Sequence, residues 1–308
     1  MATTHDILRD LALSRGTLDR VGHERRDPLV VAALLRDPAT RVLDVRGALL
    51  PVHPHRDGPR LALRAPTEQD ASRLVVHLGR DRGGTAYLAC IGAADESLGP
   101  PSWLTLREVG DALGDRDAGI CTTAVALANW HAVHPRCPRC GRRTVPEQAG
   151  WVRRCPADGS EHYPRTDPAV IMSVLDPDDR LLLARSPGWP EGRFSVLAGF
   201  VEPGESFEAA VAREVAEEVG LALDEVRYLG NQPWPFPSSV MVGYESRTSQ
   251  TQLRLDPTEI AEARWVTRAG YVALLRRGAI QVPSGISIAR RIIEHWLGEP
   301  VEAVAPGA

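Results

Sequence analysis

Three glutamates in one acidic segment have the spacing of a cation-binding site. In GFVEPGESFEAAVAREVAEEVGL (residues 199–221), Glu214 and Glu218 are four residues apart and Glu217 stands beside them. A helix turns by roughly 100° per residue and therefore places all three carboxylates on one face, where they repel each other unless a cation compensates them. Such hard oxygen ligands suit Mg²⁺ or Mn²⁺, and these ions also bind substrate phosphates. The alternative is a solvated acidic helix face that binds nothing.

Local signals around these glutamates predict a helix over residues 206–219. Pro203 and Gly204 favour a turn, and Ser206 is a favourable N-cap for the helix that follows. Arg213 is adjacent to the carboxylates and is predicted to hold Glu205 in place. The apolar positions that are expected to pack this helix against a sheet are Phe207, Ala210, Val211 and Val215.

A proline-rich segment, QPWPFPSS (residues 232–239), follows shortly afterwards. Three prolines in five residues predict a stiff, extended loop that loses little entropy on binding. Trp234 and Phe236 would then offer aromatic surfaces on which the flat ring of a ligand, such as a base, can stack. The alternative is a surface loop whose aromatic rings are buried for stability.

Three of the five cysteines fall within 19 residues and form a repeated pattern. Cys137-Pro-Arg-Cys140-Gly is followed by Cys155-Pro-Ala-Asp158-Gly, so that Asp158 takes the place of a fourth cysteine. This two-knuckle arrangement is typical of a zinc ribbon. Asp158 is the preferred fourth ligand, because it holds the same knuckle position as Cys140, and His162 is its rival. A module with free thiols and no Zn²⁺ is the alternative.

The same region is basic. Residues 136–165 hold seven arginines against three acidic residues, a local balance of 7 − 3 = +4. This excess predicts either a patch for nucleic-acid phosphates or charge compensation for thiolates around Zn²⁺. The sequence leaves both interpretations open.

Composition excludes several other classes of protein. The chain has 308 residues, 43% hydrophobic and 25% charged, with a formal net charge of −4, and all 36 basic residues are arginine. Lysine-dependent chemistry is therefore excluded, and the acidic balance argues against a dedicated DNA-binding protein. No apolar run approaches the roughly 20 residues of a membrane span. Charges at the N-terminus argue against a signal peptide, and clustered cysteines favour a reducing, cytoplasmic compartment.

The order of apolar runs predicts three parts. Residues 1–117 fit a strand-rich mixed domain, with runs at 29–35, 41–52, 60–65, 73–80 and 85–93. Residues 118–167 comprise a helix over 118–133 and the cysteine segment. Residues 168–300 predict strands at 169–175, 181–185, 194–201, 226–229 and 240–244 and a closing helix over 286–297. The apolar stripe of that helix is Ala289, Ile292, Ile293 and Trp296, with Arg290, Arg291 and Glu294 off it, and the tail 301–308 is expected to fray.

The acidic segment matches a known family motif. The residues that match the Nudix box are Gly199, Glu205, Arg213, Glu214, Val215, Glu217, Glu218, Gly220 and Leu221. The QPWPFPSS loop and the preceding zinc-ribbon pattern resemble those of the NADH pyrophosphatase subfamily of Nudix hydrolases. The resemblance implies an α/β (α+β) chain: a Nudix α/β/α sandwich, a zinc ribbon and an N-terminal Nudix-like mixed domain. It further implies cleavage of NADH or NAD⁺ to AMP and nicotinamide mononucleotide, and some members also remove NAD caps from RNA.

The resemblance also implies roles for individual residues. Metal ligands are the backbone carbonyl of Ala198 and the carboxylates of Glu214, Glu218 and Glu259, while one of Glu214, Glu217 and Glu218 is the general base. The substrate-contact positions are Tyr163, Gln232, Pro233, Trp234, Pro235, Phe236, Pro237, Ser238, Ser239 and Ala289. The zinc ligands are Cys137, Cys140, Cys155 and Asp158. Expected partners are NADH or NAD⁺, NAD-capped RNA and a second copy of the chain, since the subfamily is commonly homodimeric.

Two rival functions remain at this stage. One is a Nudix hydrolase of ADP-ribose or another nucleoside diphosphate derivative, against which the QPWPFPSS loop argues. The other is a noncatalytic nucleotide sensor with a Nudix fold. A sensor has no need of the box carboxylates, yet all of them are present.

Overall fold

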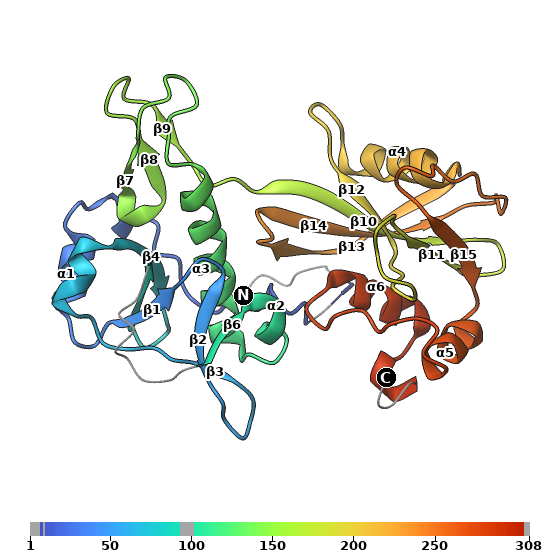
Figure 1. Cartoon of the computed structure of the whole chain (residues 1–308), viewed down its shortest axis with the longest axis horizontal. Coiled ribbons are helices and arrows are strands. Elements are labelled where there is room, and N and C mark those ends of the chain that lie inside the picture. Colours follow the sequence, from blue (N-terminus) through green and yellow to red (C-terminus); the bar gives the residue numbers. More distant parts are fainter. Residues whose placement is uncertain (1–6, 9, 93–101, 305–308) are drawn as a thin grey trace. The chain divides into compact units, whose positions relative to one another are not determined.

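The computed structural model describes residues 7, 8, 10–92 and 102–304. It divides into two compact units (Figure 1). The C-terminal unit contains the described residues up to Leu11, Asp167–Gln232 and the chain from Val240 onward, whereas the N-terminal unit contains Ala12–Thr166 and Pro233–Ser239. Among the described residues, no helix has both the length and the apolar character that a membrane span requires.

The C-terminal unit is built on a six-stranded sheet in the order β13-β14-β10-β11-β15, with β12 paired to β10. β10 is antiparallel to both β11 and β12, and β11 is antiparallel to β15. The strands are β10 (Asp167–Leu175), β11 (Leu181–Arg185), β12 (Leu197–Phe200), β13 (Glu225–Trp234), β14 (Ser239–Arg247) and β15 (Glu262–Val266). The helices are α4 (Phe207–Val219), α5 (Arg268–Arg276), α6 (Ile288–Leu297) and α7 (Val301–Val304).

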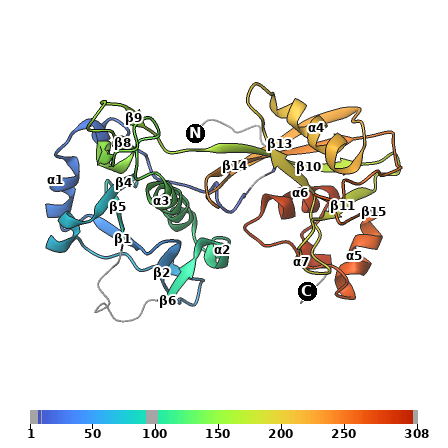
Figure 2. The ribbon, with the colours of Figure 1, turned by 45° about the horizontal axis from the view of Figure 1, so that its top comes forward.

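Both faces of this sheet are covered, because its central strands are apolar on both sides. On β10, Ile171 and Leu175 pack with α5 and α6, whereas Val170, Met172 and Val174 pack with α4. Successive side chains on a strand point to opposite faces, and a continuous apolar run therefore demands two cores. Figure 2 shows α4 and α6 on opposite sides of the sheet. The result is the expected α/β/α sandwich.

The N-terminal unit contains two three-stranded sheets, β1-β5-β4 and β3-β2-β6. In the first sheet, β1 and β5 are parallel and β4 is antiparallel to β5; α3 packs on one face and α1 on the other. The strands are β1 (Arg41–Val45), β2 (Leu49–His53), β3 (Arg60–Leu61), β4 (Leu74–Arg80), β5 (Ala86–Ile91) and β6 (Ser102–Thr105). The helices are η1 (Glu24–Arg26), α1 (Val30–Arg36), η2 (Glu68–Ser72), α2 (Leu106–Val109) and α3 (Asp115–Val133).

The cysteine segment forms a small separate sheet at the end of α3. Its order is β7-β8-β9, with β7 (Val145–Glu147), η3 (Gln148–Gly150), β8 (Val152–Arg154) and β9 (Glu161–His162). A buried polar chain joins it to α3: Arg153 Nη1 lies 2.8 Å from His131 Nδ1, and His131 Nε2 lies 2.8 Å from the Gly150 carbonyl. A guanidinium can only donate, so Nδ1 accepts and Nε2 carries the proton. This contact fixes one neutral tautomer of His131.

Two expectations about the elements were wrong, and parts of others fall on residues that the structure does not describe. Residues 29–35, counted among the strand-like runs, form most of α1, because a short apolar run does not distinguish a strand from a buried helix. The tail does not fray at its start, since α7 buries Val301 and Val304 in the core. The N-terminal residues 1–6, residue 93 of the predicted strand 85–93, and the tail residues 305–308 lie outside the described part of the chain.

The closing helix α6 is more buried than its sequence suggests. Its apolar stripe is in the core as expected, but Arg290 and Glu294, which stand off that stripe, are each only 8% exposed. Arg290 donates to Glu294 at 3.0 Å and also pairs with Glu302, while Glu294 accepts from the Val301 backbone. The returning α7 segment therefore supplies the polar partners that make this burial tolerable.

We predict that His131 makes the fold sensitive to acid. Burial lowers the pKa of His131 to about 4, so that between pH 6.5 and 4 the unfolded chain binds a proton that the folded chain does not. Stability is therefore complete above pH 6.5 and is lost as the pH falls toward 4. From pH 7.5 to 5.5, the wild type should lose about 1 kcal/mol more unfolding free energy than His131→Gln, whose amide keeps both contacts without titrating. Urea unfolding at the two pH values measures this difference, and equal losses would contradict the assignment.

Candidate metal-dependent hydrolase site

The acidic helix α4 forms where the sequence predicts it. Ser206 Oγ accepts a hydrogen bond from Ala209 N at 3.2 Å, which confirms the N-cap, and Gly220 ends the helix in the left-handed conformation. Ala210, Val211 and Val215 are fully buried against the sheet, as expected. Phe207, in the first turn, was expected to be buried as well, but it is 41% exposed. The buried side holds α4 rigidly and fixes the direction of its carboxylates.

Glu214, Glu218 and Glu259 come together at the edge of this helix. One carboxylate oxygen from each lies within 4.8 Å of the others. Glu214 and Glu218 are 8% and 7% exposed, whereas Glu259 is exposed. Glu217 is outside this cluster: its side chain is 59% exposed and accepts from Arg213 at 2.9 Å.

Glu259 is brought to the cluster by backbone hydrogen bonds at the end of α4. Arg254 N donates to the Val219 carbonyl at 2.9 Å, and Asp256 N donates to the Glu218 carbonyl at 3.0 Å. A turn then forms, with Ile260 N donating to the Asp256 carbonyl at 2.8 Å. The segment that carries Glu259 is therefore hydrogen-bonded to the C-terminal end of α4, where Glu218 lies.

Arg213 orients the acidic residues without neutralising all of them. Its guanidinium donates to both oxygens of Glu205 at 2.9 and 3.0 Å, to Glu214 and Glu217 at 2.9 Å, and to the Phe200 carbonyl. The predicted contact between Arg213 and Glu205 is thus present. In contrast, Glu218 receives nothing from Arg213, and its Oε2 is a buried acceptor with no hydrogen-bond partner among the described residues.

The strand beside the helix leaves room for this arrangement only at a glycine. A Cβ atom placed on Gly199 of β12 would lie 1.9 Å from the carboxyl carbon of Glu214. Any other residue at this position would push the Glu214 side chain away. The glycine that begins the acidic segment is therefore needed for close approach of strand and carboxylate.

The donor set fits a hard divalent cation. Burial, together with the charges of Glu214, Glu259 and Glu217, raises the pKa of Glu218 to about 8, and burial also raises the pKa of Glu214. Carboxylates destabilised in this way gain most from a positive ion placed among them. An orphaned buried acceptor and three convergent oxygen ligands are what Mg²⁺ or Mn²⁺ would satisfy.

The predicted recognition loop, residues 232–239, is not an extended loop, because it comprises the end of β13 and a turn that leads into β14. Pro233–Ser239 belong to the N-terminal unit. Trp234 and Phe236 meet edge to face at 4.8 Å, and both rings are half-buried against the core of that unit. The Arg107 guanidinium lies 3.9 Å from the centre of the Phe236 ring and 5.0 Å from that of Trp234. Asn129 donates to the Pro235 carbonyl at 2.9 Å. Sequence reasoning missed Arg107 and Asn129, because nothing in the sequence links residues more than a hundred positions apart.

The structure places the other predicted site residues in varied surroundings. Tyr163 is 60% exposed and donates to Glu161, while Ala198 of β12 is paired with Ile171 and its side chain is exposed. Gln232 is fully buried and donates to the Ile286 carbonyl at 2.9 Å. Ala289 is 4% exposed and lies in the core beneath the sheet. Their roles toward substrate remain predictions.

The cysteine segment gathers a second metal-binding group. Cys137, Cys140, Cys155 and Asp158 offer ligand atoms within 4.8 Å of one another, and Cys140 Sγ is 3.5 Å from Cys155 Sγ. The two knuckles share one backbone pattern, since Gly141 N donates to the Cys137 carbonyl and Gly159 N to the Cys155 carbonyl, each at 2.9 Å. His162 is not one of these four residues, but it lies beside them: its Nε2 is 3.1 Å from Ser160 Oγ and its side chain contacts Cys137. Three thiols and one carboxylate around a single point fit Zn²⁺.

An α/β/α sandwich with a buried acidic helix defines the class of a Nudix hydrolase, and comparison with known proteins agrees. Residues 165–282 match the NUDIX domain model, residues 133–163 the NADH pyrophosphatase zinc ribbon domain, and residues 25–130 the NADH pyrophosphatase-like rudimentary NUDIX domain. The chain is similar to the NAD-capped RNA hydrolase NudC of Mycobacterium bovis, with 42% identity over 304 residues, 91% of this chain and 94% of that protein. It is also similar to the human NAD-capped RNA hydrolase NUDT12, with 41% identity over 197 residues, 60% of this chain and 43% of that protein. The chain belongs to the NADH pyrophosphatase subfamily of Nudix hydrolases.

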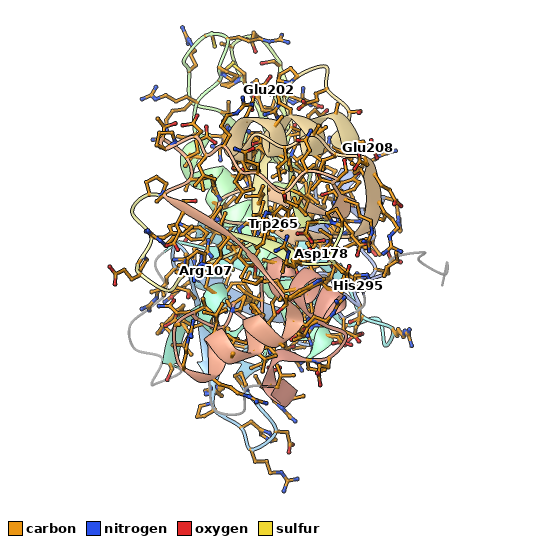
Figure 3. The ribbon with its side chains drawn as sticks, turned by 90° about the vertical axis from the view of Figure 1, so that its right-hand side faces the viewer. Arg107, Asp178, Glu202, Glu208, Trp265 and His295 are labelled. Carbon is orange, nitrogen blue, oxygen red and sulfur yellow. The ribbon has the colours of Figure 1, made fainter. Side chains whose placement is uncertain are left out.

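We predict that Glu218→Gln abolishes hydrolysis and leaves the fold intact. The substitution weakens a metal ligand or base, which should lower kcat by on the order of a hundredfold or more. In chelator, the variant should melt no earlier than the wild type, because it removes a repelled, buried charge. Glu208→Gln is the matched control, since Glu208 (labelled in Figure 3) is exposed on the first turn of the same helix and is not one of the three clustered glutamates. Near-normal turnover of folded Glu218→Gln would refute the role of this residue.

We predict one Zn²⁺ per chain, with Asp158 as its fourth ligand. After mild chelation, Asp158→Ala should lose zinc that His162→Ala retains, as measured by elemental analysis. Asp158→Cys should retain zinc at least as well as the wild type, because thiolate is the stronger zinc ligand. The reverse ranking, with zinc lost from His162→Ala and kept by Asp158→Ala, would make His162 the ligand.

Proposed function

We propose that the chain hydrolyses the pyrophosphate bond of NADH and NAD⁺, with water as the second reactant and AMP and nicotinamide mononucleotide as products. One observation carries the proposal: Glu214 and Glu218 of the Nudix box converge with Glu259, which lies beyond the box, and a buried oxygen of Glu218 has no hydrogen-bond partner among the described residues. Such a cluster binds the cations that a diphosphate substrate needs. Since similar proteins are named NAD-capped RNA hydrolases, we extend the proposal to NAD caps on RNA.

Mg²⁺ or Mn²⁺ is the proposed catalytic cofactor. Glu214, Glu218 and Glu259 would hold it, together with the backbone carbonyl of Ala198. When bound, the cations neutralise the diphosphate and lower the pKa of the attacking water. Arg213 fixes the rotamers of Glu205, Glu214 and Glu217 through its hydrogen bonds, so the carboxylates are oriented before substrate arrives.

One of the box glutamates takes the proton from the attacking water. Glu214, Glu217 and Glu218 all stand at or beside the cluster, and they differ in environment. Glu217 is exposed and paired with Arg213, whereas Glu218 has a pKa raised to about 8 by burial and neighbouring charges. A raised pKa near neutrality suits a general base, but the same group is also a proposed ligand. The assignment among the three stays open.

Residues 232–239 are the proposed determinant for the nicotinamide nucleotide. Trp234 and Phe236 are held by each other and by the Arg107 guanidinium, and the Asn129 amide donates to the Pro235 carbonyl between them, so this segment is ordered before binding. A preorganised loop loses little entropy when a ligand binds. Both rings keep part of their surface exposed, which supports a stacking role as well as a structural one.

A reducing, cytoplasmic location and a homodimer complete the proposal. None of the five cysteines forms a disulfide, which supports a reducing compartment. The homodimer is a prediction from family resemblance, and sedimentation of the zinc-loaded chain would decide it.

The test of the proposed reaction is product analysis after incubation with NADH, NAD⁺, ADP-ribose and NAD-capped RNA, with Mg²⁺ and Mn²⁺ compared. We expect AMP and the nicotinamide mononucleotide from the dinucleotides, and 5′-monophosphate RNA from capped RNA. Preferential cleavage of ADP-ribose would favour the rival hydrolase. Binding of nucleotide without any product would identify a sensor.

The same assay examines the loop. Trp234→Ala and Phe236→Ala should each weaken NADH use more than use of a small diphosphate ester without an aromatic ring. A lost stacking partner is worth about 1–3 kcal/mol. Equal losses on both substrates, with a lowered melting temperature, would mean that the loop only supports the fold.

A further inference from the structure

The first knuckle of the zinc ribbon exposes an unusual concentration of positive charge. The hairpin 136–143, RCPRCGRR, contains Arg136, Arg139, Arg142 and Arg143 and no large apolar side chain. All four arginines are exposed. Figure 1 shows the loops of the ribbon extending from β7–β9, away from β1 and β4 of the same unit. These side chains therefore face water from a projecting part of the N-terminal unit.

Carboxylates of the ribbon do not compensate these arginines. Glu147 and Glu161 both bind Arg154, the former at 2.7 Å, and Asp158 accepts from Ser160 N and Oγ. Within the described parts of the chain, no acidic side chain lies within ion-pair distance of Arg136, Arg139, Arg142 or Arg143. The positive excess that the sequence shows is thus concentrated on one hairpin.

The hairpin also places like charges opposite each other. Arg136 and Arg143 form an antiparallel bridge, and the one described acceptor of the Arg136 guanidinium is the Gly141 carbonyl, at 3.0 Å. Like charges at directly opposite positions destabilise a strand pair. Such an arrangement is relieved when an anion binds between or beside the guanidinium groups.

Compensation of the thiolate cluster does not explain the arginines. Cys137 Sγ accepts from Arg139 backbone N at 3.4 Å, lies 3.6 Å from Ser160 Oγ and 3.7 Å from Asp158 Oδ2, and is also in contact with the His162 side chain. Among the described residues, none of the four guanidinium groups donates to a thiol or to Asp158. The charge is therefore directed outward, although two of the predicted zinc ligands, Cys137 and Cys140, lie in the same hairpin.

We propose that this hairpin binds the phosphate backbone of the RNA chain that follows an NAD cap. Guanidinium groups recognise phosphate through charge-assisted, bidentate hydrogen bonds. Positively charged grooves and surfaces also bind single-stranded nucleic acid without sequence preference. The lack of large apolar side chains in the hairpin argues against a protein partner. The inference rests on the proposed cleavage of NAD-capped RNA and assigns the polynucleotide part of that substrate to the ribbon.

The experiment compares two charge-matched triple variants of the full, zinc-loaded chain. The test variant carries Arg139→Gln, Arg142→Gln and Arg143→Gln, and leaves Arg136 with its backbone contact. The control variant carries Arg36→Gln, Arg82→Gln and Arg277→Gln, because these arginines are also exposed and without ion pairs among the described residues. Zinc content by elemental analysis verifies that the ribbon of each variant is intact.

With an unstructured NAD-capped RNA of roughly 20 nucleotides at low salt, the test variant should lose about tenfold in kcat/KM, and NADH cleavage should stay unchanged. Three lost phosphate contacts should also reduce the slope of log(kcat/KM) against log[salt] by about 2. An unchanged rate on capped RNA, an equal loss in the control variant, or an equal loss on NADH would each overturn the proposal.

A direct binding measurement separates this proposal from the proposed function. Fluorescence anisotropy with 5′-monophosphate RNA of the same sequence records the contact without any cleavage. If the wild type cleaves NADH but not capped RNA, the proposed RNA substrate is wrong, and weaker RNA binding by the test variant alone still supports the hairpin as a phosphate site. Unchanged RNA binding by that variant would refute it.

Discussion

Repulsion between buried carboxylates is the constraint on which the catalytic unit depends. Glu214 and Glu218 are both nearly buried, and Glu259 is fastened beside them by the backbone at the end of α4. Arg213 donates to Glu214 but not to Glu218, so the negative charge of the cluster is only partly compensated by the described residues. A buried negative charge without a partner is costly, and the cluster must therefore take up a proton or a cation. The sheet, the α4 helix and the close approach at Gly199 all serve to keep these oxygens together.

Much of this site could be predicted from the sequence because its determinants are local. The turn, the N-cap, the four-residue spacing and the arginine that holds Glu205 all lie within 23 residues of one another. The zinc knuckles were predictable for the same reason, since each is closed by hydrogen bonds across five or six residues. The outward position of Phe207 could not be predicted, because periodicity marks a face without saying where the core ends.

The features that sequence reasoning missed depend on contacts between distant segments. The run 29–35 is a helix because the β1-β5-β4 sheet needs a cover on its second face, and its letters alone fit a strand equally well. Arg290 and Glu294 are buried because α7 returns over them. Arg107 meets Phe236 across 129 positions of the chain. Each case requires knowledge of a partner that no local pattern encodes.

The buried hydrogen bonds between α3 and the zinc ribbon imply that zinc stabilises more than the ribbon itself. His131, Arg153 and Thr144 form a continuous buried hydrogen-bonded chain, and Trp151 Nε1 donates to the His77 carbonyl of β4 at 2.8 Å. The ribbon also approaches β4 so closely that a Cβ on Gly150 would lie 2.7 Å from Val76. A ligand that binds only the folded ribbon stabilises, by mass action, everything that folds with it. The stability of the entire N-terminal unit should therefore depend on the concentration of free zinc. Removal of zinc would shift the folding equilibrium of this unit toward the unfolded state.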